Sequence, residues 1–365
     1  LFYSLFTCLS AFSQEPWHMV VLRFLVAMGV GGEWAVASAM VAEVMPKRSR
    51  PVMSSIFHAS SVFGTLLAAA TIALLIGNQQ LNASLAERGI DGWRVGFAIG
   101  VLPALLTLWI RWKLREPESW TAARDRARED DAQPTGRISE LFSSAYLRNT
   151  VIGVSLATIG LVTFWGGHIY GKNALMRKAQ TEVLNMENVA PDADKKVKAE
   201  TFKKYKSKIK RAEMTSMTLN TIGAGLGLVF FGGISNRIGR KGAFVLYHTM
   251  AFVMMLVLFK GLIATDASKV ALMVCLPIFG FFTVGMHAGY AVYFPELYPT
   301  RLRGTGTGFC FNMGRLGTAA AFFGFAAMTS PPTPETKAMW LAPLFLLGVV
   351  VVLFARETRG EDLPE

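Results

Sequence analysis

The sequence predicts an all-α membrane protein built from two parallel halves, on three observations. Its 365 residues are 52% hydrophobic and only 17% charged, with a mean hydropathy of +0.38, which differs from the composition of a soluble enzyme. Apolar runs of about 20 residues, enough to cross a bilayer as a helix, recur along the chain. A Glu-x-x-Pro-x-Arg-x-Arg turn occurs at 43–50 and again at 296–303, each time between two apolar runs. Two copies in the same order indicate parallel repeats.

The apolar runs give the expected spans in order. They fall at 1–13, 18–45, 51–77, 94–114, 148–171, 214–235, 242–263, 269–296, 304–328 and 339–355. At the offset of the repeated turn, the run at 242–263 corresponds to the short run at 1–13. The two preceding runs have no counterpart after Leu1. We therefore expect about ten of twelve transmembrane helices in this chain, with the first two spans and part of the third preceding Leu1.

Basic residues predict the orientation and the domains. Lys and Arg gather in the turns at 46–50, 236–241 and 300–303, and at the ends of the two halves, so we expect these segments in the cytoplasm. The expected domains are an N-terminal half, a cytoplasmic linker, a C-terminal six-helix half with an extracytoplasmic insertion, and a cytoplasmic tail. Their ranges are 1–114, 115–147, 148–355 with the insertion at 172–213, and 356–365.

The insertion at 172–213 departs from the charge rule. It holds twice as many basic as acidic residues, yet the alternation of spans places it outside. We favour a solvated insertion without a binding role. Phe202, Tyr205 and Ile209 recur at roughly helical spacing among the lysines, so the alternative is a basic amphipathic helix on a membrane surface that binds lipid or a partner.

Several motifs, in order, carry a family resemblance. Asn236-Arg237-Ile238-Gly239-Arg240-Lys241 resembles the cytoplasmic turn of the major facilitator superfamily, although Asn236 stands where Asp is usual. The stretch from Glu296 to Gly317 resembles the tenth-to-eleventh span region of its organic-acid and sugar symporters. Arg23-Phe24-Leu25 with Gly29 to Trp34 is similar to the fourth span of its proton-coupled sialate, monocarboxylate and aromatic-acid branch.

This resemblance implies a fold and a function. The fold is that of two six-helix halves, and the function is alternating-access transport, with proton symport of a small organic anion such as a monocarboxylate, a sialate or an aromatic acid. A transporter of a neutral sugar or a cationic metabolite is the alternative within transport. A transport-dead membrane sensor or scaffold is the alternative from another class.

Ionisable groups inside spans are costly unless paired or hydrated, so they are candidates for function. Glu33 lies about 15 Å into its span and is a candidate proton carrier, or else a permanently paired structural charge. Arg315 lies about 18 Å beyond Arg303 and can hold a substrate carboxylate through its planar donors. Bracing of helices, or pairing with Glu33, is the alternative. We expect Arg23, nearer the outer rim, to reach the interface.

The resemblance also implies which other residues line the cavity. The first, fourth, seventh and tenth spans line it in the superfamily, which favours Trp34, Trp165, His168, His287 and Tyr290 over His58. His287 is the repeat counterpart of Trp34 and is a candidate second proton site. Asn312 lies beside Arg315 in the same span. Packing in the core is the alternative for each of these residues.

The repeated turns predict a cytoplasmic gate. Ion pairs between their acids and neighbouring arginines would stabilise the state that is closed on the inside. The candidate gate residues are Glu43, Arg48, Arg50, Arg237, Arg240, Glu296, Arg301 and Arg303. Charges that only set the topology are the alternative.

Other patterns exclude several classes of protein. The sequence has no catalytic triad, metal-ligand spacing or phosphate loop, and Cys8, Cys275 and Cys310 are isolated, so we expect no enzyme, no cofactor and no metal. Gly223 and Gly227 predict close helix packing instead. The expected partners are a small-molecule substrate, protons and the lipid bilayer, without nucleic acid. We expect a monomer in a bacterial inner membrane with a cytoplasmic C-terminus.

Overall fold

The computed structural model describes residues 1–75, 79–113, 120–122, 124–125, 135–190, 192–328 and 333–364. The predicted boundary at 114/115 and most of the first part of the linker lie outside them. Regular structure in the described part of the first half is helical. The elements are α1 (Phe2–Leu9), η1 (Ser10–Phe12), α2 (Pro16–Val44), α3 (Arg50–Ala59), α4 (Ser61–Leu75), α5 (Gln79–Glu87), α6 (Gly92–Ile99) and α7 (Leu102–Lys113).

The second half is also helical where it is described, after a short turn of linker helix. Its first elements are η2 (Ile138–Phe142), α9 (Leu147–Thr163), η3 (Phe164–His168), α10 (Ile169–Gly171), α11 (Ala174–Met186), α12 (Lys195–Lys204) and α13 (Lys206–Leu256). It continues with η4 (Val257–Ile263), α14 (Lys269–Gly285), α15 (His287–Tyr293), η5 (Phe294–Leu297), α16 (Thr300–Ala326), α17 (Pro334–Leu341) and α18 (Pro343–Leu353).

These helices bear out the all-α membrane fold. Seven stretches of the described chain are long and apolar enough to cross a membrane. One of them, Lys206–Ile263, turns back at Gly239, whose φ of 84° and ψ of 167° lie outside the helical region. That stretch therefore supplies both of the spans predicted at 214–235 and 242–263. Gly is needed there because a side chain at positive φ is strained.

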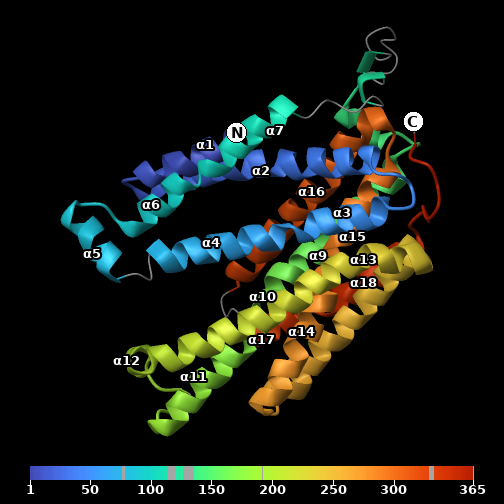
Figure 1. Ribbon diagram of the computed structural model, residues 1–365. Helices are drawn as coiled ribbons and strands as arrows, with labels where there is room; N and C mark the ends of the chain where they lie inside the picture. Colours follow the sequence, from blue (N-terminus) through green and yellow to red (C-terminus); the bar gives the residue numbers. More distant parts are fainter. Residues whose placement is uncertain are drawn as a thin grey trace.

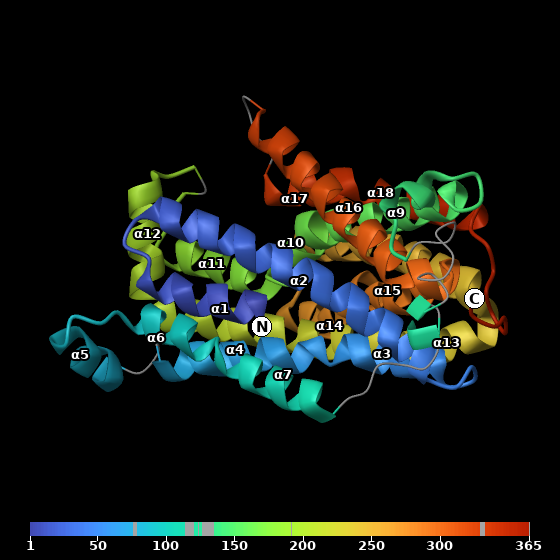
Figure 2. The same cartoon turned by 90° about the horizontal axis from the view of Figure 1, so that it is seen from above.

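The two halves form two bundles that meet along α2, α3, α13, α15 and α16 (Figure 1). They converge toward the end that carries the C-terminus and diverge toward α5 and α12 (Figure 1). The view from above places α5 and α12 at the same end of the molecule (Figure 2). We call the convergent end, which holds the turns at 45–49, 236–241 and 298–300, the basic-turn end.

Close packing inside the second half uses the predicted glycine pair. A Cβ on Gly223 would overlap the carbonyl of Pro277, and one on Gly227 would overlap the carbonyl of Phe281. The backbones of α13 and α14 therefore approach each other directly, as the small-residue spacing predicts. This contact makes the pair α13 and α14 a rigid wall of the second half.

The insertion at 172–213 forms a helical extension at the end opposite the basic turns. Its α11 and α12 continue the bundle with the first turns of α13 (Figure 1). Ion pairs tie it to the start of α14, from Glu182 to Lys269 at 2.9 Å and from Lys178 to Asp266 at 2.8 Å. The alternative of one amphipathic helix through Phe202, Tyr205 and Ile209 does not agree with the structure, which divides this segment between α12 and α13. Tyr205 has φ −103° and ψ 23° and separates α12 from α13, while its hydroxyl donates to the Glu187 carboxylate.

Candidate functional site

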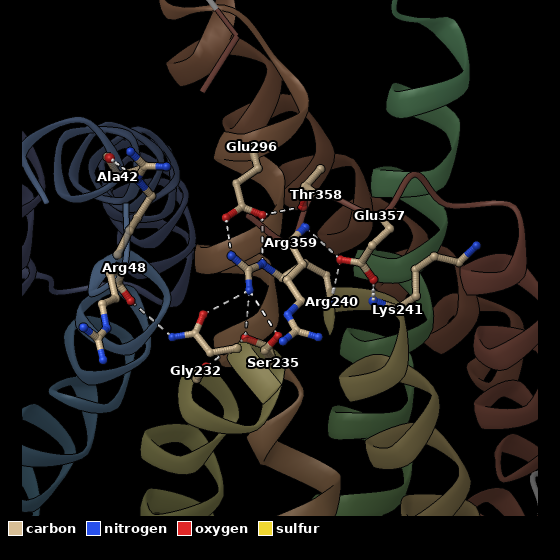
Figure 3. A network of polar contacts seen from close by, with 12 residues as sticks. Ala42, Arg48, Gly232, Ser235, Arg240, Lys241, Glu296, Glu357, Thr358 and Arg359 are labelled. Carbon is tan, nitrogen blue, oxygen red and sulfur yellow. Dashed lines mark hydrogen bonds and ion pairs between the residues drawn. The ribbon is translucent and has the colours of Figure 1, made fainter. Parts of the chain in front are cut away.

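The basic-turn end contains a buried ion pair inside the second half. Both side chains are less than a tenth exposed, and Arg240 donates from Nη2 to Glu296 Oε1 at 2.8 Å and from Nε to Oε2 at 3.0 Å. Thr358 also donates to Glu296, and Nη1 of Arg240 reaches Ser235 and the side-chain oxygen of Asn236 (Figure 3). Burying two charges costs desolvation free energy. A bidentate ion pair whose other donors and acceptors are also hydrogen-bonded offsets that cost.

The C-terminal tail closes the same turn. The Glu357 carboxylate accepts from the backbone amides of Arg240 at 2.9 Å and Lys241 at 3.0 Å (Figure 3). A Cβ on Gly239 would lie 2.5 Å from this carboxylate, so Gly239 is required by space as well as by its backbone angles. The carboxylate satisfies the free amides at the start of the second arm of α13.

A second buried ion pair crosses between the halves. Glu43 at the end of α2 pairs with Arg303 at the start of α16 at 2.6 Å, and the two side chains are 7% and 1% exposed. Arg303 also donates to the backbone carbonyls of Pro295 at 3.1 Å and Pro364 at 2.8 Å. The guanidinium is thus fully used, and it holds the first half, α16 and the tail together.

Weaker contacts surround this pair. Asn236 donates to the backbone carbonyl of Arg48 at 3.3 Å (Figure 3). Lys47 pairs with Asp362 at 3.0 Å on the surface. A Cβ on Gly232 would overlap the Pro51 carbonyl, so α13 and α3 touch through their backbones. Together these contacts close the basic-turn end.

The other predicted gate residues take different positions. Arg301 forms a bidentate pair with Glu140 of the linker, and this contact holds the pKa of the guanidinium above its usual value. The Nε of Arg50 donates to the carbonyl of Ala42 at 2.7 Å within the first half. The side chains of Arg48 and Arg237 are exposed and make no hydrogen bond or ion pair among the described residues.

Several partners in this network lie outside the predicted site residues, among them Glu140, Glu357 and Thr358. The sequence carries a signal for Glu357, because an Arg-Glu pair follows the last span of each half, at 115–116 and 356–357. Glu140 has no such signal. It lies in the linker, and only the fold brings it to Arg301.

The centre of the interface between the halves is aromatic. Trp34 of α2 stacks on Phe311 of α16 with ring centroids 4.1 Å apart, and its Nε1 donates to Nδ1 of His58 in α3 at 3.0 Å. Next to this stack, Asn312 donates to the Gly31 carbonyl at 3.1 Å. Trp34 and Asn312, both predicted candidates, therefore meet across the two halves.

Arg315 lies beside the same stack. Its guanidinium carbon is 5.0 Å from the centre of the Phe311 ring, and Nη1 donates to the side-chain oxygen of Asn312 at 3.0 Å. It is half-buried, and no carboxylate of the described residues pairs with it. A cation held this way in a span is available to an anionic ligand.

The structure does not bring Glu33 to Arg315. A Cβ on Gly31 would face Arg315 and Asn312, whereas one on Gly29 would face Tyr3 of α1. Glu33 is one turn beyond Gly29 and thus on the same side of α2, where its charge acts on Tyr3. Glu33 is exposed in this chain and faces the interior of the first half rather than α16.

Arg23 also stays within the first half. Its guanidinium carbon lies 4.3 Å from the centre of the Phe97 ring of α6. Its Nη2 is buried and makes no hydrogen bond within the described part of the chain. Arg23 thus joins α2 to α6 through a cation–π contact, and its position at the membrane interface stays a prediction.

The remaining candidates line one side of the second half. His168 is 4% exposed, stacks between Phe164 and Phe279, and its Nδ1 lies 2.8 Å from the Thr283 hydroxyl. Phe164 also contacts His287 edge-on, and the two histidines thereby share one ring.

His287 and Tyr290 bind backbone carbonyls of α9. His287 Nε2 lies 3.2 Å from the Gly160 carbonyl and the Tyr290 hydroxyl donates to Leu156 at 2.9 Å. Trp165, by contrast, is 52% exposed. The structure therefore brings Trp34, Asn312 and Arg315 into one cluster, His287 and Tyr290 next to it, and leaves Trp165 apart.

A crevice of about 590 Å³ opens between α2, α16 and the linker. Glycines line much of it, with Gly31 and Gly32 on one wall and Gly304 and Gly308 on the other. Asn312 closes its inner end and Arg301 its end at the basic turns. The crevice therefore runs along the seam between the halves, from the gate to the aromatic centre.

The contacts between the halves are unevenly distributed. The hydrogen bonds, ion pairs and ring contacts that join the described parts of the two halves all use residues 31–62 of the first half and the tail. None of those observed in the described residues uses the part of α2 before Gly31. The halves are closed from the centre to the basic-turn end, whereas α2 before Gly31 makes no such contact with the second half among the described residues.

Groups of three or more metal-binding side chains do not occur among the described residues. No site for a metal is therefore proposed. The chemistry that the cluster offers is hydrogen bonding, stacking and attraction of an anion.

Comparison with known proteins agrees with this architecture. The family model of the Major Facilitator Superfamily matches residues 1–322. Among solved structures, the proton:xylose symporter XylE bound to 6-bromo-6-deoxy-D-glucose superposes with a TM-score of 0.70 at 16% identity, covering 99% of this chain and 80% of that one. The fucose transporter FucP in the outward conformation superposes with a TM-score of 0.58 at 16% identity, covering 97% of this chain and 80% of that chain. These likenesses confirm the predicted fold.

Relatives of assigned function are transporters. A probable 4-methylmuconolactone transporter of Cupriavidus pinatubonensis is 25% identical over 99% of this chain and 74% of its own length. The sialic acid transporter NanX of Escherichia coli is 28% identical over 87% of this chain and 66% of its own length. The cis,cis-muconate transport protein of Acinetobacter baylyi is 27% identical over 98% of this chain and 77% of its own length. The chain spans only part of each relative.

Proposed function

Because the chain belongs to the Major Facilitator Superfamily, and so is a multi-pass membrane transporter rather than an enzyme, we propose that it is a proton-linked symporter of a small organic anion. The proposal includes a bacterial inner membrane, a monomer, and a cytoplasmic location for the basic-turn end and the C-terminus. In this arrangement the structure corresponds to the state closed toward the cytoplasm. The insertion at 172–213 then lies outside.

The proposed substrate class, a small organic anion, rests mainly on the environment of Arg315. A guanidinium half-buried in a span without a carboxylate partner among the described residues carries a desolvation cost. A substrate carboxylate would offset that cost by a bidentate contact. Trp34 and Phe311 beside it offer flat apolar surfaces for the rest of a planar or ring-shaped acid.

The transporters of related sequence support this substrate class. Their names include sialic acid and cis,cis-muconate, both carboxylic acids. The likeness to the xylose and fucose symporters concerns the fold alone, because identity is 16%. An organic anion therefore agrees better with the cluster around Arg315 than a neutral sugar does.

The gate supports alternating access. Moving a population from 1:99 to 99:1 takes about 5.5 kcal/mol, and breaking a buried pair by removing one partner costs about 3–5 kcal/mol. The pair Glu43–Arg303, with the contacts of Gly232 and Asn236, can therefore set most of the bias toward the state closed at the basic-turn end. Substrate and proton binding must supply free energy of that order to open it.

Uptake by proteoliposomes tests the substrate class. We would measure uptake of labelled sialic acid, cis,cis-muconate and xylose by the parent, by Arg315→Gln and by the control Arg211→Gln, whose side chain is exposed in the insertion. We expect uptake of the acids, and a KM at least tenfold higher in Arg315→Gln, because a charged hydrogen bond is worth about 1.5–3 kcal/mol. Equal KM values in parent and variant, or uptake of xylose alone, would contradict the proposal.

The proton part needs its own variant. Glu33→Gln is compared with the parent across an imposed pH gradient, with uptake at zero gradient as reference. We expect accumulation against a concentration gradient in the parent and equilibration only in the variant, since an amide carries no exchangeable proton at these pH values. Unchanged accumulation would exclude Glu33 as the proton carrier.

A further inference from the structure

His58 lies on the side of α3 that faces the other half. Pro51 and Ser55 of α3 lie against Gly232, and Val62 lies against Gly225. His58 follows Pro51 by seven residues and Ser55 by three, so it lies on this same stripe of the helix. Its side chain therefore points into the seam between the halves.

The contact with Trp34 determines the protonation state of His58. An indole nitrogen can only donate a hydrogen bond, so the Nδ1 atom that lies 3.0 Å from Trp34 Nε1 must be the acceptor. His58 is thus neutral, with its proton on Nε2. A second proton could only go to Nδ1, where it would face the indole N–H and remove the hydrogen bond.

The indole that His58 holds is part of the contact between the halves. Trp34 stacks on Phe311 of α16 with ring centroids 4.1 Å apart. The guanidinium carbon of Arg315 lies 5.0 Å from the centre of the same Phe311 ring. A chain of direct contacts therefore leads from His58 through Trp34 and Phe311 to Arg315. Loss of the first contact loosens the platform beside the guanidinium.

We propose that His58 is a positioning residue that, when neutral, holds Trp34 against Phe311 beside Arg315 and, when protonated at Nδ1, releases it. This inference rests on the proposed proton-linked function. The step adds one proton to the Nδ1 lone pair and breaks only the hydrogen bond from Trp34. Proton uptake thereby loosens the centre of the closed interface without a charge having to move between the halves.

The groups around His58 are few. Helix α15 packs against α3 and carries His287, whose positive charge would oppose protonation of His58. From α2 the neighbour is Trp34, while Glu33 acts on Tyr3 instead. Where α13 meets α3, the contacts are made by Gly225 and Gly232, which carry no charge. Within the described chain, His287 is thus the group that can compete with His58 for the proton.

Three variants separate positioning from packing. His58→Gln keeps an acceptor but cannot take up the proton, His58→Leu removes the acceptor, and Trp34→Phe keeps a stacking ring without the donor. His18→Gln, at the outer start of α2, is the control for loss of a histidine. Each is purified and compared with the parent for the pH dependence of Trp34 fluorescence, obtained as the difference from Trp34→Phe, and for KM and kcat of organic-anion uptake.

We expect a step in Trp34 fluorescence below the pH range in which free histidines titrate, because protonation of His58 costs the hydrogen bond from Trp34. This step should be absent from His58→Gln. His58→Leu should raise KM about threefold to tenfold with kcat unchanged, the effect of one hydrogen bond, and His58→Gln should restore it. In Trp34→Phe the midpoint of the pH profile of uptake should move to higher pH, because protonation no longer costs a hydrogen bond.

The outcomes keep this inference apart from the proposed function. If the parent takes up no organic anion, the proposed function is wrong. The fluorescence step then still tests whether the protonation of His58 changes the environment of Trp34. A fluorescence step that persists in His58→Gln, or equal KM values in His58→Leu and the parent, would overturn the inference. If a His58 variant does not fold, Trp34→Phe is used instead. A midpoint of its pH profile of uptake that equals the parent value would contradict the inference about His58.

Discussion

The two ends of the seam between the halves differ in kind. At the basic-turn end, a buried ion pair, backbone contact at Gly232 and a hydrogen bond from Asn236 join the halves. At the divergent end, the described residues of α2 before Gly31 make no polar or ring contact with the second half, and the bundles separate (Figure 1). The free energy that holds this state is thus concentrated at one end, and that is where changes have the largest effect.

A second comparison lies within the basic-turn end. Glu43 and Glu296 occupy equivalent positions in the repeat, yet Glu43 pairs across the halves with Arg303 and Glu296 pairs inside its own half with Arg240. The first pair must break when the halves part, and the second need not. Variants of the two pairs can therefore separate opening from unfolding.

The largest effect is expected from Arg303→Met. It removes the guanidinium that pairs with the buried Glu43 carboxylate, and breaking a buried ion pair in this way costs about 3–5 kcal/mol in the closed state. We would measure labelling of a cysteine at Ser55, which is fully buried at the seam, with a maleimide reagent, and expect a rate roughly 100-fold higher than in the parent.

Arg240→Met is the matched control for this variant. It breaks a pair of similar burial within one half, so it should lower the free energy of unfolding by a comparable amount while leaving the Ser55→Cys labelling rate near the parent value. Equal acceleration by both variants would show that the Glu43–Arg303 pair has no special role in closing the seam.

An intermediate effect is expected from Gly232→Ala. The added methyl overlaps the Pro51 carbonyl in the closed state, and such overpacking costs about 1–3 kcal/mol. Gly233→Ala is its neighbour and control, because a Cβ there meets nothing within 4 Å. Labelling at Ser55→Cys should accelerate roughly tenfold in the first variant only, and acceleration in both would mean that helix propensity, not the seam, is responsible.

A small effect is expected from Arg48→Ala and Arg237→Ala. Both side chains are exposed and make no hydrogen bond or ion pair among the described residues, so each change should alter unfolding and labelling by no more than about 0.5 kcal/mol. Two of the eight predicted gate residues would then serve the membrane orientation alone. A large effect on the Ser55→Cys labelling rate would place them in the gate after all.

The smallest effect concerns the insertion at the divergent end. Hydrogen bonds from Lys204 and then Tyr205 hold the pKa of the partly exposed Glu187 below its usual value of 4.5. A lowered pKa in the folded state stabilises above pH 4.5, and this stabilisation is lost as the pH falls below it. A spin label at Lys195 in α12 should gain mobility between pH 6 and pH 3, and the change should vanish in Glu187→Gln. Identical changes of spin-label mobility in the parent and in Glu187→Gln would contradict this role of Glu187.

Hydropathy and the repeat predicted most of the fold, for reasons that individual elements make clear. Spans such as α2 and α16 are set by the length of apolar runs, which a bilayer requires, and the turn at Gly239 by a residue that tolerates positive φ. The break at Tyr205 could not be predicted, because it depends on a hydroxyl reaching Glu187 from another helix. Helical spacing alone favours a continuous helix there.

The sequence predicted which residues belong to the candidate site, but not which of them contact one another. Glu33 and Arg315 can be selected from the sequence because burying a charged side chain in a membrane span costs free energy. Only the structure shows that the two residues lie on helix faces with different neighbours. His58 was ranked below the other histidines because its span does not line the cavity in the superfamily. Its contact with Trp34 is made between two helices, and no spacing along the chain indicates it.

Distances across the two ends test the central claim, that the contacts at the basic-turn end hold the halves closed, most directly. Spin labels at Lys47 and Arg237 report on the basic-turn end, and labels at Trp17 and Arg211 report on the divergent end; these four side chains are exposed. In lipid nanodiscs, pulsed electron paramagnetic resonance on Arg303→Met should show the first distance lengthening and the second shortening relative to the parent. Distances that stay at their parent values, or that change in the same direction at both ends, would contradict the account.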